Sequence, residues 1–185
     1  MSLEQDREEL KAILRKYSVR RGEEFTLASG RKSNVYVDAR VTTLRAQAMP
    51  LIGRLFLAKM AERGWRPLAV GGLTMGADPV VSAIAHESAA GEEIVDAFIV
   101  RKEAKKHGMQ RQIEGLSNSD PIDVVVVEDV ATTGGSAGTA IEACRKAGLH
   151  VLGAISLVDR EEGAAERIID ELKCPFDRIF RLSEL

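Results

Sequence analysis

Two adjacent carboxylates and a loop of small hydroxyl residues stand close together in the middle of the chain. Glu128 and Asp129 follow an apolar run, and the segment Thr132-Thr133-Gly134-Gly135-Ser136 begins three residues later. Glycines let a backbone approach a ligand closely, and the N–H groups at the start of a helix attract a phosphate. This loop therefore predicts a phosphate site, with an ordinary capped helix at a solvated strand end as the alternative.

The acidic pair needs a different role, because carboxylates repel a phosphate. Ribose hydroxyls, a magnesium ion, or both would suit Glu128 and Asp129. The loop has no lysine after its glycines and no GxGxxG spacing, so it is neither a Walker sequence nor a dinucleotide fingerprint. The pair and the loop together indicate a phosphate ligand with a second group that the carboxylates bind.

A strongly basic run follows a predicted strand. Its net charge is +4, in a chain whose total is −2, from five basic residues and one acidic residue: Arg101, Lys102, Lys105, Lys106, Arg111 and Glu103. A diphosphate leaving group needs cations where charge develops, and a lid would bring them while excluding water. Gly108 and Gly115 are candidate hinges of such a lid. A solvated charged face is the alternative.

The apolar periodicity predicts the elements that position these residues. We expect helices over 4–17, 51–60, a stretch ending near 89, 135–147 and 164–172, and strands over 24–28, 34–39, 68–72, 94–100, 122–127, 151–158 and 177–182. Apolar strands that alternate with helices imply an α/β domain with a mostly parallel sheet and helices on both faces. Ligands bind beyond the carboxyl ends of such strands, which predicts a site at 71–76, 101–115, 128–136 and 159–160.

The composition is that of an ordinary globular protein. With 185 residues, 45% of them hydrophobic and 29% charged, the chain is expected to form one domain. The net charge of −2 argues against a nucleic-acid-coating protein, and 4% aromatic residues argue against a stacking platform for single strands. No apolar run approaches the roughly 20 residues of a membrane helix. The charged start, and Cys144 and Cys174 without a CxxC motif, favour a cytoplasmic protein with free thiols.

The segment 124–136 resembles the signature of the phosphoribosyltransferases that use phosphoribosyl diphosphate (PRPP), with its apolar strand, acidic pair and Thr-Thr-Gly-Gly-Ser loop. The resemblance implies the fold of that family, including a small N-terminal hood. It also implies that Glu128 and Asp129 bind the ribose hydroxyls, with Asp129 serving catalysis. The rest of this PRPP site is then Val130, Ala131, Thr132, Thr133, Gly134, Gly135 and Ser136.

The basic run resembles the catalytic loop of the orotate phosphoribosyltransferases, an Arg-Lys-Glu-x-Lys-x-His-Gly segment. The resemblance implies that Arg101, Lys102, Lys105 and His107 contact the diphosphate of PRPP and that Lys105 and His107 are catalytic. Members of that family act as homodimers whose loop crosses into the neighbouring site, so Lys105 and His107 are expected to work in trans. Magnesium is the expected cofactor, held mainly by PRPP.

Three further stretches agree with this resemblance. Residues 25–36 resemble the hood segment over the base, and residues 70–79 resemble the loop beside the diphosphate. Leu157-Val158-Asp159-Arg160 resembles the strand end whose arginine pairs with the orotate carboxylate. A guanidinium fork suits a planar carboxylate, so the resemblance makes Arg160, together with Thr132, the expected orotate contact.

Arg160 also has a simpler interpretation, a surface salt bridge with Glu161 or Glu162. The chain departs from the family pattern at two positions, because some members carry lysine where this chain has Ala28 and Gly76. Neither lysine is carried over to this chain. Diphosphate binding near Gly76 is then expected to rest on backbone N–H groups.

As a whole, the resemblance implies transfer of the 5-phosphoribosyl group from PRPP to orotate, giving orotidine 5′-monophosphate and diphosphate in pyrimidine synthesis. The expected organisation is one domain over 1–185, with the hood largely in 1–45 plus C-terminal contributions and the core at about 46–160. Orotate can be anionic at neutral pH, so its N1 needs no strong general base. The alternatives are a purine phosphoribosyltransferase and a PRPP-binding regulator without catalysis. The expected partners are PRPP, orotate and a second copy, with no nucleic acid and no membrane.

Overall fold

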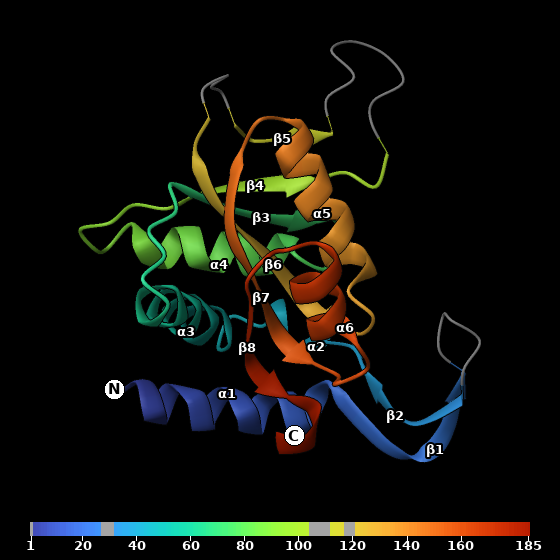
Figure 1. The fold of residues 1–185 in the computed structure, drawn as a ribbon. Coiled ribbons are helices and arrows are strands. Elements are labelled where there is room, and N and C mark those ends of the chain that lie inside the picture. The colour runs from blue at the N-terminus through green and yellow to red at the C-terminus, as the bar shows by residue number, and fades with distance from the viewer. Residues whose placement is uncertain (1, 27–31, 104–111, 117–120) are drawn as a thin grey trace.

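A computed structural model describes residues 2–26, 32–103, 112–116 and 121–185, and contains two sheets (Figure 1). The smaller sheet is an antiparallel hairpin of β1 (Val19–Thr26) and β2 (Lys32–Val37). The larger sheet has the order β5-β4-β3-β6-β7-β8. Its strands are β3 (Ala69–Leu73), β4 (Asp96–Val100), β5 (Ile113–Glu114), β6 (Asp123–Ala131), β7 (His150–Asp159) and β8 (Phe176–Arg181).

The described chain also contains helices before and between these strands. They are α1 (Leu3–Tyr17), α2 (Arg40–Thr43), α3 (Met49–Glu62), α4 (Asp78–Ser88), α5 (Gly135–Lys146) and α6 (Ala164–Glu166), which continues as a π-helical turn, Arg167–Glu171. A 3₁₀ turn, Leu182–Glu184, ends the chain. Every strand pair of the larger sheet is parallel except β4–β5. The predicted α/β architecture with a mostly parallel sheet is confirmed.

Two apolar layers enclose the sheet, because successive side chains of a strand point to opposite faces. In β6, Val125 and Val127 belong to the layer formed with α1, α3 and α4, whereas Val124 and Val126 belong to the layer formed with α5 and α6. Figure 1 shows these helices on the two sides of the sheet. The four valines are buried to 1% exposure or less. This double burial explains why the strand has no polar alternation.

Several boundaries differ from the sequence-based expectation. Strand β6 does not end at residue 127 but continues to Ala131, because the ladder to β7 continues through Val130 and Val158 to Ala131 and Asp159. The larger sheet includes β8, so it extends to Arg181 and past the expected core boundary near 160. Within the described ranges, β5 and α2 are elements that periodicity did not predict. Both are too short to carry a period of their own.

The hairpin lies beside the carboxyl end of β7 (Figure 1). Its strand β2 leads directly into α2, and the Asp38 N–H donates to the Ser18 carbonyl at 3.0 Å, which closes the base of the hairpin. Cys144 and Cys174 are buried free thiols, as expected. None of the helices in the described ranges is long and apolar enough to cross a membrane.

Candidate functional site

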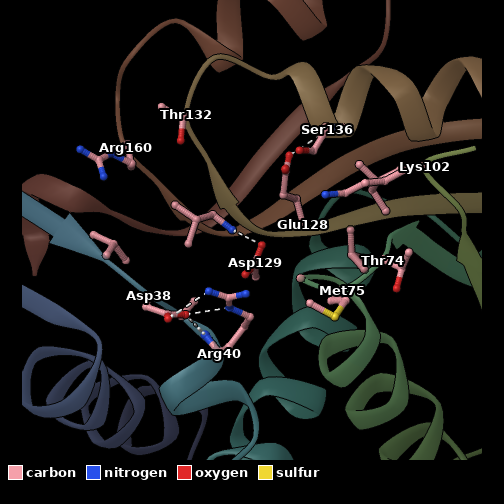
Figure 2. A pocket seen from close by; sticks show the side chains of 17 residues that line it. Asp38, Arg40, Thr74, Met75, Lys102, Glu128, Asp129, Thr132, Ser136 and Arg160 are labelled. Atoms are coloured by element: carbon pink, nitrogen blue, oxygen red, sulfur yellow. Dashed lines mark hydrogen bonds and ion pairs between the residues drawn. The ribbon is translucent and has the colours of Figure 1, made fainter. Parts of the chain in front are cut away.

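A cavity of about 300 Å³ opens where the carboxyl ends of β3, β6 and β7 meet the base of the hairpin. This is the edge at which a parallel sheet is expected to bind its ligand. Figure 2 shows the polar side chains that line it. They come from four of the predicted regions and from one that was not predicted: Thr74, Lys102, Glu128, Asp129, Thr132, Ser136, Arg160, Asp38 and Arg40.

The acidic pair, Glu128 and Asp129, lines this cavity. The Glu128 carboxylate accepts a bond from the Ala137 N–H at 3.2 Å and another from the Ser136 hydroxyl. Burial and the nearby charge of Asp129 raise the pKa of Glu128 to about 7, against the lowering effect of these two bonds. Burial also raises the pKa of Asp129, whose Oδ1 accepts the Val130 N–H at 2.9 Å. Both carboxylates are therefore partly desolvated groups that a ligand with donors would stabilise.

The predicted phosphate loop connects β6 to α5. Gly134 has a φ of +74° and precedes the first residue of α5, and the Glu128 carboxylate accepts the Ala137 N–H in the first turn of this helix. A left-handed backbone at this point favours glycine. Val130, Thr132 and Ser136 line the cavity, whereas Ala131, Thr133, Gly134 and Gly135 do not. The helix start nevertheless lies at the cavity edge, through Ser136 and Ala137, and its remaining N–H groups suit an anion.

The loop after β3 closes the cavity from the other side. A side chain at Gly76 would overlap the Asp129 carboxylate, so glycine permits the close approach of this loop to the acidic pair. The Thr74 hydroxyl donates to Asp78 Oδ2 at 2.8 Å, which ties the loop to the start of α4. This packing explains why a lysine at position 76, the family variant noted above, does not fit this backbone without a shift of Asp129.

The predicted cations fall into three groups. Lys102 lines the cavity, as does Arg160. Arg101 does not line it, and its guanidinium lies 3.7 Å from Glu114 on β5. Lys105 and His107 lie outside the described residues.

The salt bridge with Glu162 that was the simpler interpretation of Arg160 is present, but the arginine is buried and not on the surface. It lines the cavity, and its Nε donates to Glu162 Oε1 at 2.8 Å. Its Nη2 also reaches strand β2, at 3.4 Å from Ser33 Oγ and 3.3 Å from the Val35 carbonyl. The guanidinium thus connects the hairpin to the cavity.

Asp38 and Arg40 are cavity residues that sequence reasoning missed. Arg40 donates from Nε and Nη2 to the two Asp38 oxygens, at 2.9 and 3.1 Å. Figure 2 shows the Arg40 guanidinium pointing toward Asp129. The charge of Arg40 offsets part of the rise that burial causes in the pKa of Asp129. They lie at the end of the predicted strand 34–39, and no local pattern indicated that this strand ends beside the larger sheet.

The metal-binding capacity of the site is limited. Glu128 and Asp129 offer hard oxygen donors of the kind that magnesium prefers. In the part of the chain that the structure describes, no group of three or more His, Cys, Asp or Glu could hold a metal ion. Such a donor set fits an ion that a bound ligand mainly carries.

Comparison with known proteins agrees with this geometry. Residues 42–180 match the phosphoribosyl transferase domain. The chain is 49% identical to the orotate phosphoribosyltransferase of Corynebacterium glutamicum over 97% of this chain and 93% of that protein. It is 45% identical to the enzyme of the same name from Aquifex aeolicus, over 97% of each chain. The crystal structure of Mycobacterium tuberculosis orotate phosphoribosyltransferase in complex with PRPP superposes with a TM-score of 0.80 at 42% identity, covering 97% of this chain and 98% of that one.

Proposed function

We propose that this chain, which belongs to the phosphoribosyl transferase family, is an orotate phosphoribosyltransferase. It transfers the 5-phosphoribosyl group from PRPP to orotate and releases diphosphate, in pyrimidine biosynthesis. The observation that carries this proposal is one cavity that combines an acidic pair, the start of helix α5 and a buried guanidinium. Only the last of these distinguishes orotate from a purine, since a purine base has no carboxylate for Arg160 to bind.

PRPP occupies the sheet side of the cavity in this proposal. Glu128 and Asp129 accept bonds from the ribose hydroxyls, and the start of α5 with Thr132 and Ser136 binds the 5′-phosphate. Lys102 contacts the diphosphate from the basic run, with Arg101 beside it. Lys105 and His107 join them as catalytic residues.

Orotate binds between Thr132 and Arg160, with its carboxylate on the guanidinium. Its N1 attacks the ribose C1, and the bond from C1 to the diphosphate oxygen breaks, with the electron pair leaving on diphosphate. The protein positions the two reactants and neutralises the leaving group, and no residue has to remove a proton from an anionic ring. Exclusion of water protects the cationic ribosyl centre from hydrolysis.

Magnesium fits this site as a cofactor carried mainly by PRPP, since the acidic pair supplies two oxygen donors and lies beside the ribose position. When bound, it would offset part of the diphosphate charge. Glu128 and Asp129 would then hold it together with the ribose hydroxyls.

The protein is proposed to act as a cytoplasmic homodimer in which the basic run crosses to the neighbouring subunit, with the hood largely in 1–45. Mixing tests the sharing of the loop. A Lys105→Ala subunit and an Asp129→Asn subunit should each be inactive alone and regain activity when mixed, because a hybrid dimer holds one complete site. No recovery in mixed dimers would indicate a loop that serves its own subunit.

The direct test of the function compares orotate, uracil, adenine and hypoxanthine as acceptors with PRPP and magnesium. We expect nucleotide formation from orotate, and little from uracil, which differs by the carboxylate. Turnover of adenine but not of orotate would refute the assignment in favour of a purine enzyme. PRPP binding without turnover of any base would favour a regulator.

A further inference from the structure

The backbone of Arg160 is held in a defined position at the end of the sheet. Its N–H donates to the Ala131 carbonyl at 2.9 Å, which extends the β6–β7 ladder by one bond. The preceding residue, Asp159, is buried, and its Oδ2 lies 3.3 Å from Arg178 Nε on β8. Arg160 therefore leaves the sheet from a fixed point, and its side chain is only 5% exposed.

The guanidinium of Arg160 has two edges that could receive a carboxylate side by side. One edge comprises Nε and Nη2, and the other comprises Nη1 and Nη2. Glu162 Oε1 accepts from Nε at 2.8 Å, and the two contacts to strand β2 involve Nη2. Glu162 thus occupies the first edge. None of these contacts involves Nη1, so a ligand carboxylate can approach at the Nη1–Nη2 edge, where it would share Nη2 with strand β2.

The neighbouring residues Glu161 and Glu162, in the turn after β7, have different contacts. The Glu161 N–H donates to Asp159 Oδ1 at 2.8 Å, and Glu161 has a φ of +60°. Its carboxylate accepts the Ser183 N–H at 3.1 Å and lies 3.5 Å from Arg181, away from the cavity residues. Glu162, in contrast, contacts Arg160, and its side chain is 21% exposed. The chain therefore offers a matched pair of adjacent carboxylates, of which one contacts Arg160.

We infer that Glu162 is a positioning residue, which holds the Arg160 guanidinium so that it presents its Nη1–Nη2 edge to the substrate carboxylate. This inference rests on the proposed function, in which Arg160 binds orotate. A guanidinium with both edges open would accept the carboxylate in two orientations, and each would place the pyrimidine N1 differently relative to the ribose C1. Reaction requires one of these placements, so a fixed edge favours turnover as well as binding.

Kinetics of Glu162→Ala, Glu162→Gln and Glu161→Ala test the role of Glu162. For Glu162→Ala we expect kcat/KM for orotate to fall about 10- to 100-fold, with a lower kcat, while KM for PRPP changes less than about twofold. Glu162→Gln should recover most of the loss, because its amide oxygen still accepts from Nε. Glu161→Ala should remain within about threefold of the unsubstituted protein.

Two results would overturn the inference. One is a Glu162→Ala protein whose kcat/KM for orotate matches that of Glu161→Ala. The other is a Glu162→Ala protein in which kcat/KM falls equally for orotate and for PRPP, the melting temperature is lower, and Glu162→Gln does not recover the activity. That result would indicate that Glu162 has a structural role only. Failure of the unsubstituted protein to use orotate would overturn the proposed function itself, so the two failures are distinguishable.

Discussion

The buried carboxyl of Glu128 should make the stability of the protein depend on pH, and the dependence has a definite sign. Its pKa is raised from the usual 4.5 to about 7, mainly by burial. The folded protein therefore keeps the proton in a range where the unfolded chain has lost it. The contribution of this group to folding is fully present below about pH 4.5 and is lost as the pH rises through 7.

Replacement of the carboxyl by an amide removes this titration. Integrating the linkage relation shows that titration of Glu128 lowers the free energy of unfolding of the unsubstituted protein by about 2 kcal/mol from pH 5.5 to 8.5. Glu128→Gln lacks this loss, so its stability relative to the unsubstituted protein should rise by about 2 kcal/mol over the same interval. The amide oxygen can keep the bond from the Ala137 N–H. Any packing cost that is independent of pH cancels, because the prediction concerns a difference between two pH values.

Urea unfolding of the ligand-free protein at pH 5.5 and 8.5 measures this difference. Glu142→Gln is the control, because Glu142 is an exposed carboxylate on α5, the helix that follows the acidic pair. From pH 5.5 to 8.5, the free energy of unfolding relative to the unsubstituted protein should rise by most of about 2 kcal/mol more for Glu128→Gln than for Glu142→Gln. A gain below about 0.5 kcal/mol, or a gain toward acid pH, would refute the reasoning that burial holds the Glu128 proton.

Three other substitutions probe the cavity and the strand beside it. A side chain at Gly72 would overlap the Val127 carbonyl of the neighbouring strand, so Gly72→Ala should lower the free energy of unfolding by about 3 kcal/mol in urea titrations, and a loss below 1 kcal/mol would contradict this packing. A side chain at Gly76 would overlap the Asp129 carboxylate, which can move. Gly76→Ala should therefore raise KM for PRPP about tenfold, with little change in the urea midpoint of unfolding. An unchanged KM would argue against the placement of PRPP. Lys102→Ala should lower kcat by about 10²-fold in steady-state assays, since it removes a leaving-group cation, and a near-normal kcat would exclude that role.

The parts of the fold that sequence reasoning predicted carry local signals. The run Val124–Val127 is apolar on both faces, and glycines follow it at the start of a helix, so a buried strand and a glycine-rich loop that opens a helix could be predicted from adjacent residues alone. Strand β5 has only two residues and exists through its pairing with Ile99 and Val100, a contact across more than ten positions of sequence. Such an element has no period to detect.

The missed cavity residues have the same physical explanation. Asp38 and Arg40 enter the site because β2 ends beside the carboxyl end of the larger sheet, and no local pattern specifies how two separate sheets are placed. For Arg160 the sequence context suggested either a ligand contact or a salt bridge. The structure shows that the two are compatible, because one guanidinium edge contacts Glu162 while the side chain lines the cavity.

The net charge of −2 does not show how the charges are arranged at the cavity. Both guanidiniums of the cavity are already paired, Arg40 with Asp38 and Arg160 with Glu162, so they act as oriented donors more than as uncompensated charges. The acidic pair has no bonded cation among the described residues and is partly desolvated, which is why its pKa values are raised. A ligand that brings hydroxyl donors to the pair offsets the electrostatic cost of this desolvation. Its binding should therefore depend on the acidic pair as much as on the cations that contact its phosphates.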